Sequence, residues 1–244
     1  MSSPQSETVT SFQIKQIAYD LGADLCGIAP VERFRNAPEG FMPRDIYNQA
    51  KCVVVYAKRL PQEVLFAQSC IPYTQANSMI CTEVDRISLK LSFKLESLGV
   101  GSVMIPSDDP YEYWDDHNQY GRGIMSLRHA AELAGLGRLG KNSLLINREL
   151  GNMVQIGALL VNRELVSDDL VDYEVCPEGC RLCLDSCPRN ALDGITVNQQ
   201  ECRPLSNFRN GKGYILKKCC ECRKVCPSAL GVRSWDEESI VKAG

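Results

Sequence analysis

Hydrophobic residues recur at helical spacing in two stretches of the first hundred residues. In residues 11–21 they fall on one face of a helix, with Thr10 or Ser11 as a possible N-cap and Gly22 as its end. In residues 80–98 the same spacing runs over a longer stretch. The pattern predicts two amphipathic helices. Their apolar positions are Ile14, Ile17, Ala18 and Leu21 in the first, and Ile80, Val84, Ile87, Leu91, Leu95 and Leu98 in the second.

Short apolar runs bounded by glycine, proline or charged residues predict buried strands. An alanine-rich stretch at 126–134 predicts one more helix before the last two strands. Alternating helices and strands indicate an α/β or α+β core. The expected strands cover residues 25–30, 51–57, 102–106, 143–150 and 153–161.

The alternating pattern stops near residue 170, where a polar connector begins that includes Ser167, Asp168, Asp169 and Asp172. We therefore place a domain boundary there, with an α/β domain over residues 1–170 and a cysteine-rich domain over residues 171–244.

Composition narrows the class of protein. The net charge is −3, and acidic and basic residues are mixed along the chain. The sequence therefore lacks the clustered basic residues that are typical of proteins that bind nucleic acid or an anionic membrane. The N-terminus lacks a signal pattern and no apolar run approaches bilayer length, so we expect a cytoplasmic protein without a membrane partner. In a reducing compartment the 13 cysteines are better explained by metal ligation than by disulfides.

Nine of the cysteines fall between Cys176 and Cys226 and form two motifs. The first resembles the bacterial ferredoxin run, with one extra residue in its first gap, and each motif ends in Cys-Pro. In such runs the last cysteine binds the neighbouring cluster. We therefore expect two 4Fe–4S clusters, while a zinc ribbon is the alternative that paired cysteines leave open. Cys220 is left outside both ligand sets. The expected ligands are Cys176, Cys180, Cys183 and Cys226 for one cluster, and Cys187, Cys202, Cys219 and Cys222 for the other.

The segment AGLGRLGKN, residues 134–142, is rich in glycine. It approaches a dinucleotide or P-loop motif, but a helix precedes it and a strand follows, the reverse of what those motifs need. Three glycines in six residues indicate a sharply bent backbone or the close approach of a bulky group. Lys141, Asn142 and Ser143 offer hydrogen-bond donors there. A tight helix-to-strand turn is the other interpretation.

Residues 108–123 combine turn residues with aromatic and titratable side chains, and predict a long loop. Such a loop is typical of a lid or a substrate pocket, and equally of a solvated loop anchored by aromatic residues. His117 and His129 are the only histidines, and we expect structural hydrogen bonds from them rather than metal ligation.

Residues 129–161, the two cysteine motifs, and the early stretches IKQIAYDLGADLCGIAP and AKCVVVYAKRLP together resemble the epoxyqueuosine reductase and reductive dehalogenase superfamily of corrinoid iron–sulfur enzymes. The resemblance implies an α+β fold, with a nitroreductase-like corrinoid-binding core and a ferredoxin-like two-cluster module. It also implies a base-off cobalamin between them. By position, its contacts would be Gly135, Gly137, Gly140, Lys141, Asn142 and Ser143.

One departure from the superfamily bears on the reaction. The aspartate that serves epoxyqueuosine reductases as proton donor aligns with Gly121, so the resemblance points instead to Tyr120 as a catalytic proton donor, by analogy with the tyrosine of reductive dehalogenases. The expected function is a cobalamin-dependent reductase of a small-molecule substrate, with a reduced ferredoxin or flavodoxin as electron donor. The alternative is a non-catalytic iron–sulfur electron carrier, or a reductive activator of a corrinoid protein.

Overall fold

The computed structural model of the chain describes residues 9–232. The polar start at residues 1–8, and residues 233–244 of the expected second domain, lie outside it. Within the described part, one four-stranded sheet has the order β1-β2-β8-β3, and every neighbouring pair is antiparallel. β2 and β8 pair along their whole length, from Cys52 opposite Val161 to Arg59 opposite Val154. The strands are β1 (Leu25–Pro30), β2 (Cys52–Arg59), β3 (Ser102–Ile105) and β8 (Val154–Val161).

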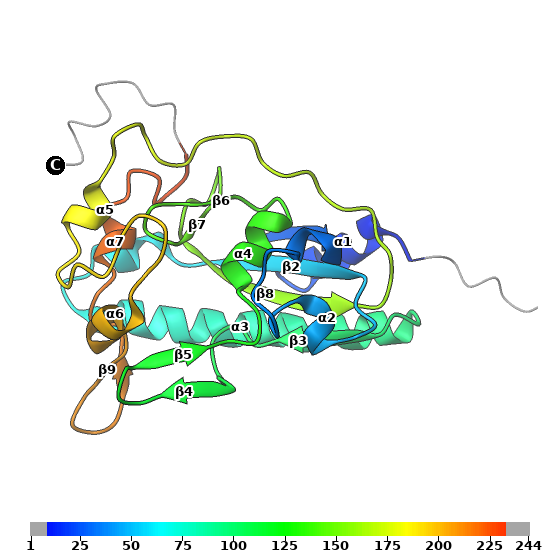
Figure 1. The fold of residues 1–244 in the computed structure, drawn as a ribbon, viewed down its shortest axis with the longest axis horizontal. Helices are drawn as coiled ribbons and strands as arrows, with labels where there is room; N and C mark the ends of the chain where they lie inside the picture. The colour runs from blue at the N-terminus through cyan, green and yellow to red at the C-terminus, as the bar shows by residue number, and fades with distance from the viewer. Residues whose placement is uncertain (1–8, 233–244) are drawn as a thin grey trace, which may run out of the picture.

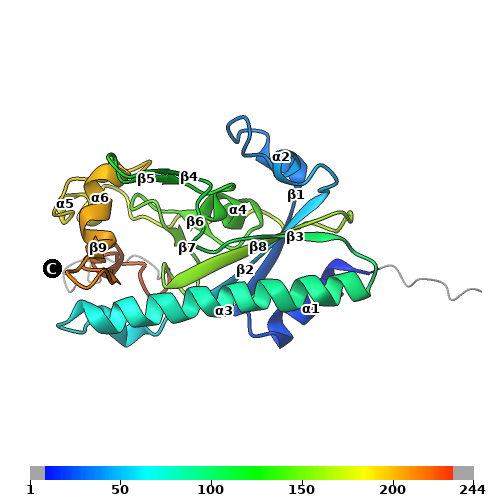
Figure 2. The same cartoon turned by 90° about the horizontal axis from the view of Figure 1, so that it is seen from below.

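Helices cover both faces of this sheet. Helices α1 (Ser11–Asp20) and α3 (Cys70–Ser97) pack on one face, and α4 (Leu127–Leu133) lies on the other, as Figure 2 shows. The first face buries Ile14 and Leu91 against β2 and β8, while the second buries Ala130 and Ala131. The central strands β2 and β8 are buried on both faces, which explains why their sequences are nearly continuous runs of apolar residues.

The elements of the cysteine-rich segment lie at one end of the molecule, beside the start of α3 (Figure 1). All of the chain's remaining elements, these included, are short. They are α2 (Pro43–Ile46), the 3-10 helices Val31–Phe34 and Gln62–Leu65, the hairpin β4 (Tyr113–Asp115) and β5 (Tyr120–Arg122), the pair β6 (Arg138–Leu139) and β7 (Leu145–Ile146), α5 (Leu182–Asp185), α6 (Gln199–Ser206), β9 (Phe208–Arg209), β10 (Ile215–Leu216) and α7 (Glu221–Lys224).

The predicted helices and central strands are present, with three differences. Helix α3 begins at Cys70, ten residues before its predicted start. The expected strand 143–150 is reduced to β7, because Ser143 has a positive φ of 60° and a turn closes between Asn147 and Gly151. The expected loop 108–123 contains the β4–β5 hairpin.

An extended connector, residues 162–181, carries the chain from β8 to α5. Its Asp168 carboxylate accepts hydrogen bonds from the backbone N–H of Ile28 at 2.8 Å and from the Lys15 ammonium at 2.6 Å. These contacts fix the connector against β1 and α1, so its path past the sheet is defined. Within residues 9–232, no helix has the length and apolarity needed to cross a membrane.

Candidate functional site

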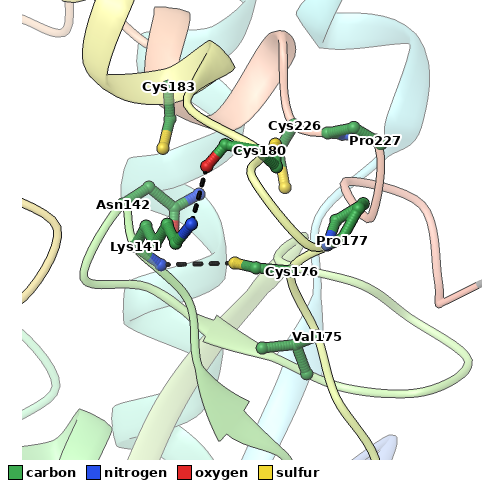
Figure 3. A pocket seen from close by; sticks show the side chains of 9 residues that line it. All are labelled: Lys141, Asn142, Val175, Cys176, Pro177, Cys180, Cys183, Cys226 and Pro227. Carbon is green, nitrogen blue, oxygen red and sulfur yellow. Dashed lines mark hydrogen bonds between the residues drawn. The ribbon is translucent and has the colours of Figure 1, made fainter. Parts of the chain in front are cut away.

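Four cysteines from two separate stretches of the chain surround one pocket (Figure 3). Cys176 and Cys180 lie in the loop before α5, Cys183 lies in α5, and Cys226 follows α7. These are the four residues that the motif spacing predicts as the first ligand set. The other lining residues are Lys141, Asn142, Val175, Pro177 and Pro227.

The thiols of this first group influence one another. Burial is the main cause that raises the pKa of Cys226 to about 12, and the charges of Cys176, Cys183 and Cys180 contribute to this value. Burial likewise raises the pKa of Cys183, with Cys176 and Cys180 adding to the effect. A bound cation would favour the thiolate forms of these cysteines, as it does at a metal-cluster site.

The other four predicted ligands form a second group. Burial raises the pKa of Cys219, with the Cys202 and Cys187 charges adding to it. Burial raises the pKa of Cys222 to about 12, and Cys202, Cys219 and Cys183 push in the same direction. Because Cys183 belongs to the first group, the two groups lie within electrostatic reach of each other.

The fit of these groups to iron–sulfur clusters can be judged from their donors. Within residues 9–232, no three cysteine, histidine or carboxylate side chains meet closely enough to hold a single metal ion. The four cysteines of the first group instead line one pocket, and four cysteine thiolates are the ligand set of a 4Fe–4S cluster. Beside the second group, the buried Arg223 has an unpaired Nη1, which suits a neighbouring group of negative charge. Cys220 instead packs against Tyr73, Leu60 and Met153.

The end of the glycine-rich segment joins the core to the cysteine loops. The backbone N–H of Lys141 donates to Sγ of Cys176 at 3.5 Å, and its ammonium donates to the carbonyl oxygen of Cys180 at 2.8 Å. The side-chain amide of Asn142 donates to the carbonyl oxygen of Cys222 at 3.0 Å. Hydrogen bonds from the N–H to a cluster sulfur are one means of tuning cluster potential.

Ser143 turns away from the cysteines. It is buried, and the Arg128 guanidinium donates to both its carbonyl oxygen and its hydroxyl, the latter at 2.6 Å. Burial lowers the pKa of Arg128, so this guanidinium is held in a partly desolvated place on α4.

The three glycines of the segment are packed against protein atoms. A Cβ on Gly135 would lie 2.2 Å from the Asp169 carbonyl oxygen, and one on Gly137 would lie 2.3 Å from that of Ile146. A Cβ on Gly140 would meet the Ile146 side chain at 2.5 Å. These glycines are therefore required by close packing within the chain, as the tight-turn interpretation has it. Their predicted contact with a corrinoid stays a prediction.

Tyr120 lies on the β4–β5 hairpin, where it pairs with Asp115. Strand alternation places it on the same face as Tyr113 and Arg122, and its ring meets that of Tyr113 edge-on at 6.3 Å between centroids. The side chain is 40% exposed. Its role as a proton donor is a prediction that these contacts leave open.

The opposite face of the hairpin is fixed to α6. Gln199 accepts from the N–H of Gly121 and donates to its carbonyl oxygen, both at 3.1 Å. The Arg203 guanidinium lies over the rings of Tyr111 and Trp114, at 5.2 and 5.0 Å from their centroids. Sequence reasoning missed Gln199 and Arg203, because nothing local marks a partner 78 residues from Gly121.

Gly121 has no room for a side chain in this arrangement. A Cβ there would lie 2.9 Å from the Trp114 ring and 3.1 Å from that of Tyr111. The space that a side chain at this position would need is thus filled by two aromatic rings.

A second cavity, of about 390 Å³, opens on the Tyr120 side of the hairpin. The Arg122 guanidinium lies 4.3 Å from the Tyr113 ring centroid at its edge. Its lining residues are Gly40, Phe41, Asp45, Ile46, Glu112, Tyr113, Arg122, Gly123 and Ile124.

Comparison with known proteins finds similar sequences over about half of the chain. It is 33% identical to the epoxyqueuosine reductase of Staphylococcus aureus over 132 residues, which are 49% of this chain and 34% of that protein. It is 32% identical to the enzyme of Lactococcus garvieae over 151 residues, 58% of this chain and 41% of that one. The matched region thus spans less than half the length of these curated relatives. No protein-family model matches the chain.

Solved structures share its fold over nearly the whole length. The structure of epoxyqueuosine reductase from Streptococcus thermophilus covers 92% of this chain with a TM-score of 0.63 at 21% identity, and 68% of that chain is matched. A catabolic reductive dehalogenase in complex with 3-bromo-4-hydroxybenzoic acid covers 98% of this chain with a TM-score of 0.69 at 18% identity, over 34% of its own length.

Proposed function

Because this chain is a distant member of the superfamily that contains the epoxyqueuosine reductases and the reductive dehalogenases, we propose that it is an iron–sulfur oxidoreductase with a 4Fe–4S cluster in each four-cysteine group. The observation that carries the proposal is the partition of eight cysteines into two groups, each assembled from separate segments. Bound clusters would supply single electrons. The chain's part is to hold and shield them.

We further propose that a base-off cobalamin is the group that receives these electrons and supplies the reducing chemistry for a small-molecule substrate. The similarity to the superfamily supports this proposal. So do the hydrogen bonds by which the side chains of Lys141 and Asn142 join the glycine-rich segment to the cysteine loops. The glycine positions do not add support, because protein atoms occupy the space beside them. A reduced ferredoxin or flavodoxin is the proposed electron donor.

For the proton that such a reduction consumes, two tyrosines are candidates. Tyr120 is the one that the resemblance indicates. Tyr111 has the more defined setting, because its hydroxyl lies 3.4 Å from the Arg203 guanidinium and 3.3 Å from the Asp108 carboxylate. Burial raises the pKa of Tyr111, so its hydroxyl keeps its proton at neutral pH, as a general acid must. Separate Tyr111→Phe and Tyr120→Phe variants distinguish them by turnover once a substrate is found.

The second candidate function is a non-catalytic electron carrier, or a reductive activator of a corrinoid protein. The packing of Gly135, Gly137 and Gly140 against protein atoms favours it, because a carrier needs the clusters and no corrinoid cavity in this chain.

Anaerobic reconstitution followed by iron, sulfide, zinc and cobalt analysis tests these proposals. We expect about eight irons per chain, since each cluster holds four. Cys226→Ser and Cys202→Ser should each weaken one cluster, while the matched control Cys220→Ser should keep both. Zinc in place of iron, or about four irons in the unaltered protein, contradicts the two-cluster proposal. Uptake of about one added cobalamin per chain, seen by its visible spectrum, supports the corrinoid enzyme, and no uptake supports the carrier.

A further inference from the structure

Helix α6 has little burial of its own to keep it in place. None of its eight residues is buried within the described chain, and Pro204 lacks the backbone N–H that would complete the helical bonding there. A helix this short is marginal in water, and in proteins it is mostly the packing of an apolar face that stabilises such a helix. The position of α6 therefore depends largely on the contacts that tie it to neighbouring segments.

One set of these contacts ties α6 to the segments of the second cysteine group. The Glu201 carboxylate accepts a hydrogen bond from the Arg189 guanidinium at 2.8 Å, and Arg189 lies two residues after one cysteine of the group. The Leu205 carbonyl oxygen accepts one from the backbone N–H of Lys218 at 3.0 Å, and Lys218 directly precedes another. Cys202 lies on the helix between these two contacts. The two neighbouring cysteines are Cys187 and Cys219.

The other set of contacts ties α6 to the β4–β5 hairpin. Gln199 makes two hydrogen bonds to the backbone of Gly121, both at 3.1 Å. The Arg203 guanidinium lies over the rings of Tyr111 and Trp114, and its Nε donates to Oε1 of Gln199 at 2.8 Å. Because Trp114 remains 42% exposed, burial alone does not fix the hairpin. Its place depends on these two side chains of α6.

Both sets of contacts meet on one side of α6. Gln199, Cys202 and Arg203 are three and four residues apart, so their side chains project from the same side of the helix. Figure 1 shows α6 beside β5, at the end of the molecule that also holds α5 and α7. Any displacement of Cys202 with its helix therefore carries the two hairpin anchors along.

We propose that α6 makes the order of the β4–β5 hairpin depend on the second cluster. This inference rests on the proposed function, which supplies that cluster. Cys202, once it binds iron, fixes a helix that burial leaves loose, and the helix fixes the hairpin through Gln199 and Arg203. These two are positioning residues, because they act through the hairpin. The hairpin carries Tyr120 and its neighbour Tyr111, so the candidate proton donors are held in place only in the cluster-loaded protein.

The coupling is tested by hydrogen–deuterium exchange of the reconstituted full chain, with iron content measured alongside. Cys202→Ala and Cys219→Ala each remove a ligand of the second cluster, one on α6 and one outside it. Cys226→Ala removes a ligand of the first cluster and is the matched control. We expect exchange in residues 113–122 to accelerate by at least about fivefold in the first two variants, because local opening becomes easier, and to stay unchanged in the third.

The reverse measurement keeps every cysteine, since a coupling between two sites acts equally in both directions. Gln199→Ala removes the bonds to Gly121, and Gln200→Ala changes an exposed neighbour as the control. Iron retention is measured at equilibrium against increasing chelator. We expect Gln199→Ala to lose about half of its iron, the share of one cluster, at about fivefold lower chelator concentration than the wild type. Gln200→Ala should match the wild type.

Several results overturn the inference. One is unchanged exchange in residues 113–122 after loss of the second cluster, and another is acceleration in Cys202→Ala alone, which would make the side chain and not the cluster the cause. Equal acceleration in a Cys226→Ala protein that keeps about four irons also overturns it. If the cysteine variants keep all their iron, or unfold and lose protection in β8, Gln199→Ala decides, and wild-type iron retention rejects the inference. A wild-type protein that fails to bind about eight irons instead contradicts the proposed function itself.

Discussion

The side-chain amide of Asn142 donates a hydrogen bond to the carbonyl oxygen of Cys222, 80 residues later in the chain, at 3.0 Å. Its Oδ1 accepts from the backbone N–H of Leu144 at 3.1 Å, and the residue is only 4% exposed. A single buried amide therefore joins the glycine-rich turn of the core to the second cysteine motif.

Replacing Asn142 by alanine should loosen that junction. Each lost buried partner costs on the order of 1–3 kcal/mol, because the group left behind is unsatisfied. We expect amide hydrogen exchange in residues 219–226 to accelerate by about tenfold or more, since 1.4 kcal/mol is a factor of ten in an equilibrium constant. Asn36→Ala, at an exposed asparagine, is the control. Unchanged exchange in the Asn142 variant would show that the bond is dispensable.

Alanine at Gly137 should destabilise the core. Its Cβ would lie 2.3 Å from the Ile146 carbonyl oxygen, and backbone atoms cannot yield as a flexible side chain can. Overpacking of this kind costs about 1–3 kcal/mol or more. Gly211→Ala is the matched control, because no atom lies within 4 Å of its added Cβ. Urea unfolding of both variants checks the difference, and equal midpoints would contradict the packing argument.

Loss of Gln199 should release the β4–β5 hairpin from α6. Gln199→Ala removes both hydrogen bonds to Gly121, whereas Gln200→Ala changes an exposed neighbour on the same helix. With a net contribution of about 0.5–1.5 kcal/mol per bond, amide exchange across residues 113–122 should rise several-fold in the first variant only. Equal exchange in both would mean that the aromatic contacts with Arg203 hold the hairpin without Gln199.

The ionisation of His129 should lower stability on the acid side. Burial lowers its pKa from 6.5, with the Arg128 charge adding to the effect. Below pH 6.5 the unfolded chain takes up a proton that the folded chain does not, so stability falls as the pH drops from 6.5 to the folded pKa and then levels off. NMR titration of the His129 ring measures the folded pKa directly, and His129→Gln should abolish this part of the pH dependence. A folded pKa at or above 6.5 would contradict the prediction.

Local patterns predicted the elements that the core buries. The spacing of Val84, Ile87, Leu91 and Leu95 found the second half of α3, because each of these side chains lies on the sheet. The sequence pattern did not predict the first turns of α3, because Pro72 and polar residues interrupt the helical spacing of apolar residues there and Ser69 alone is a weak sign of an N-cap. The spacing of the motifs also grouped Cys176, Cys180, Cys183 and Cys226, and these four line one pocket.

What depends on distant contacts was not predictable. The three-residue strands of the β4–β5 hairpin lack a period and are held by Gln199 and Arg203 on α6. Glycine is required at position 135 because the carbonyl oxygen of Asp169, 34 residues later in the chain, lies where a Cβ would be. A single sequence does not indicate such a contact. Arg223 looked like an ordinary charge on a short helix, and only its burial beside Cys222 distinguishes it.

Helix α3 is a single unbroken rod of 28 residues, about 42 Å long at 1.5 Å per residue. One end carries Thr74, whose hydroxyl accepts from the N–H of Lys217 at 2.9 Å, and the other end carries Leu95 beneath the sheet. The cysteine-rich segment is thus attached to the same helix that packs against the strands, so a movement of this segment away from the sheet would have to break its contacts with α3.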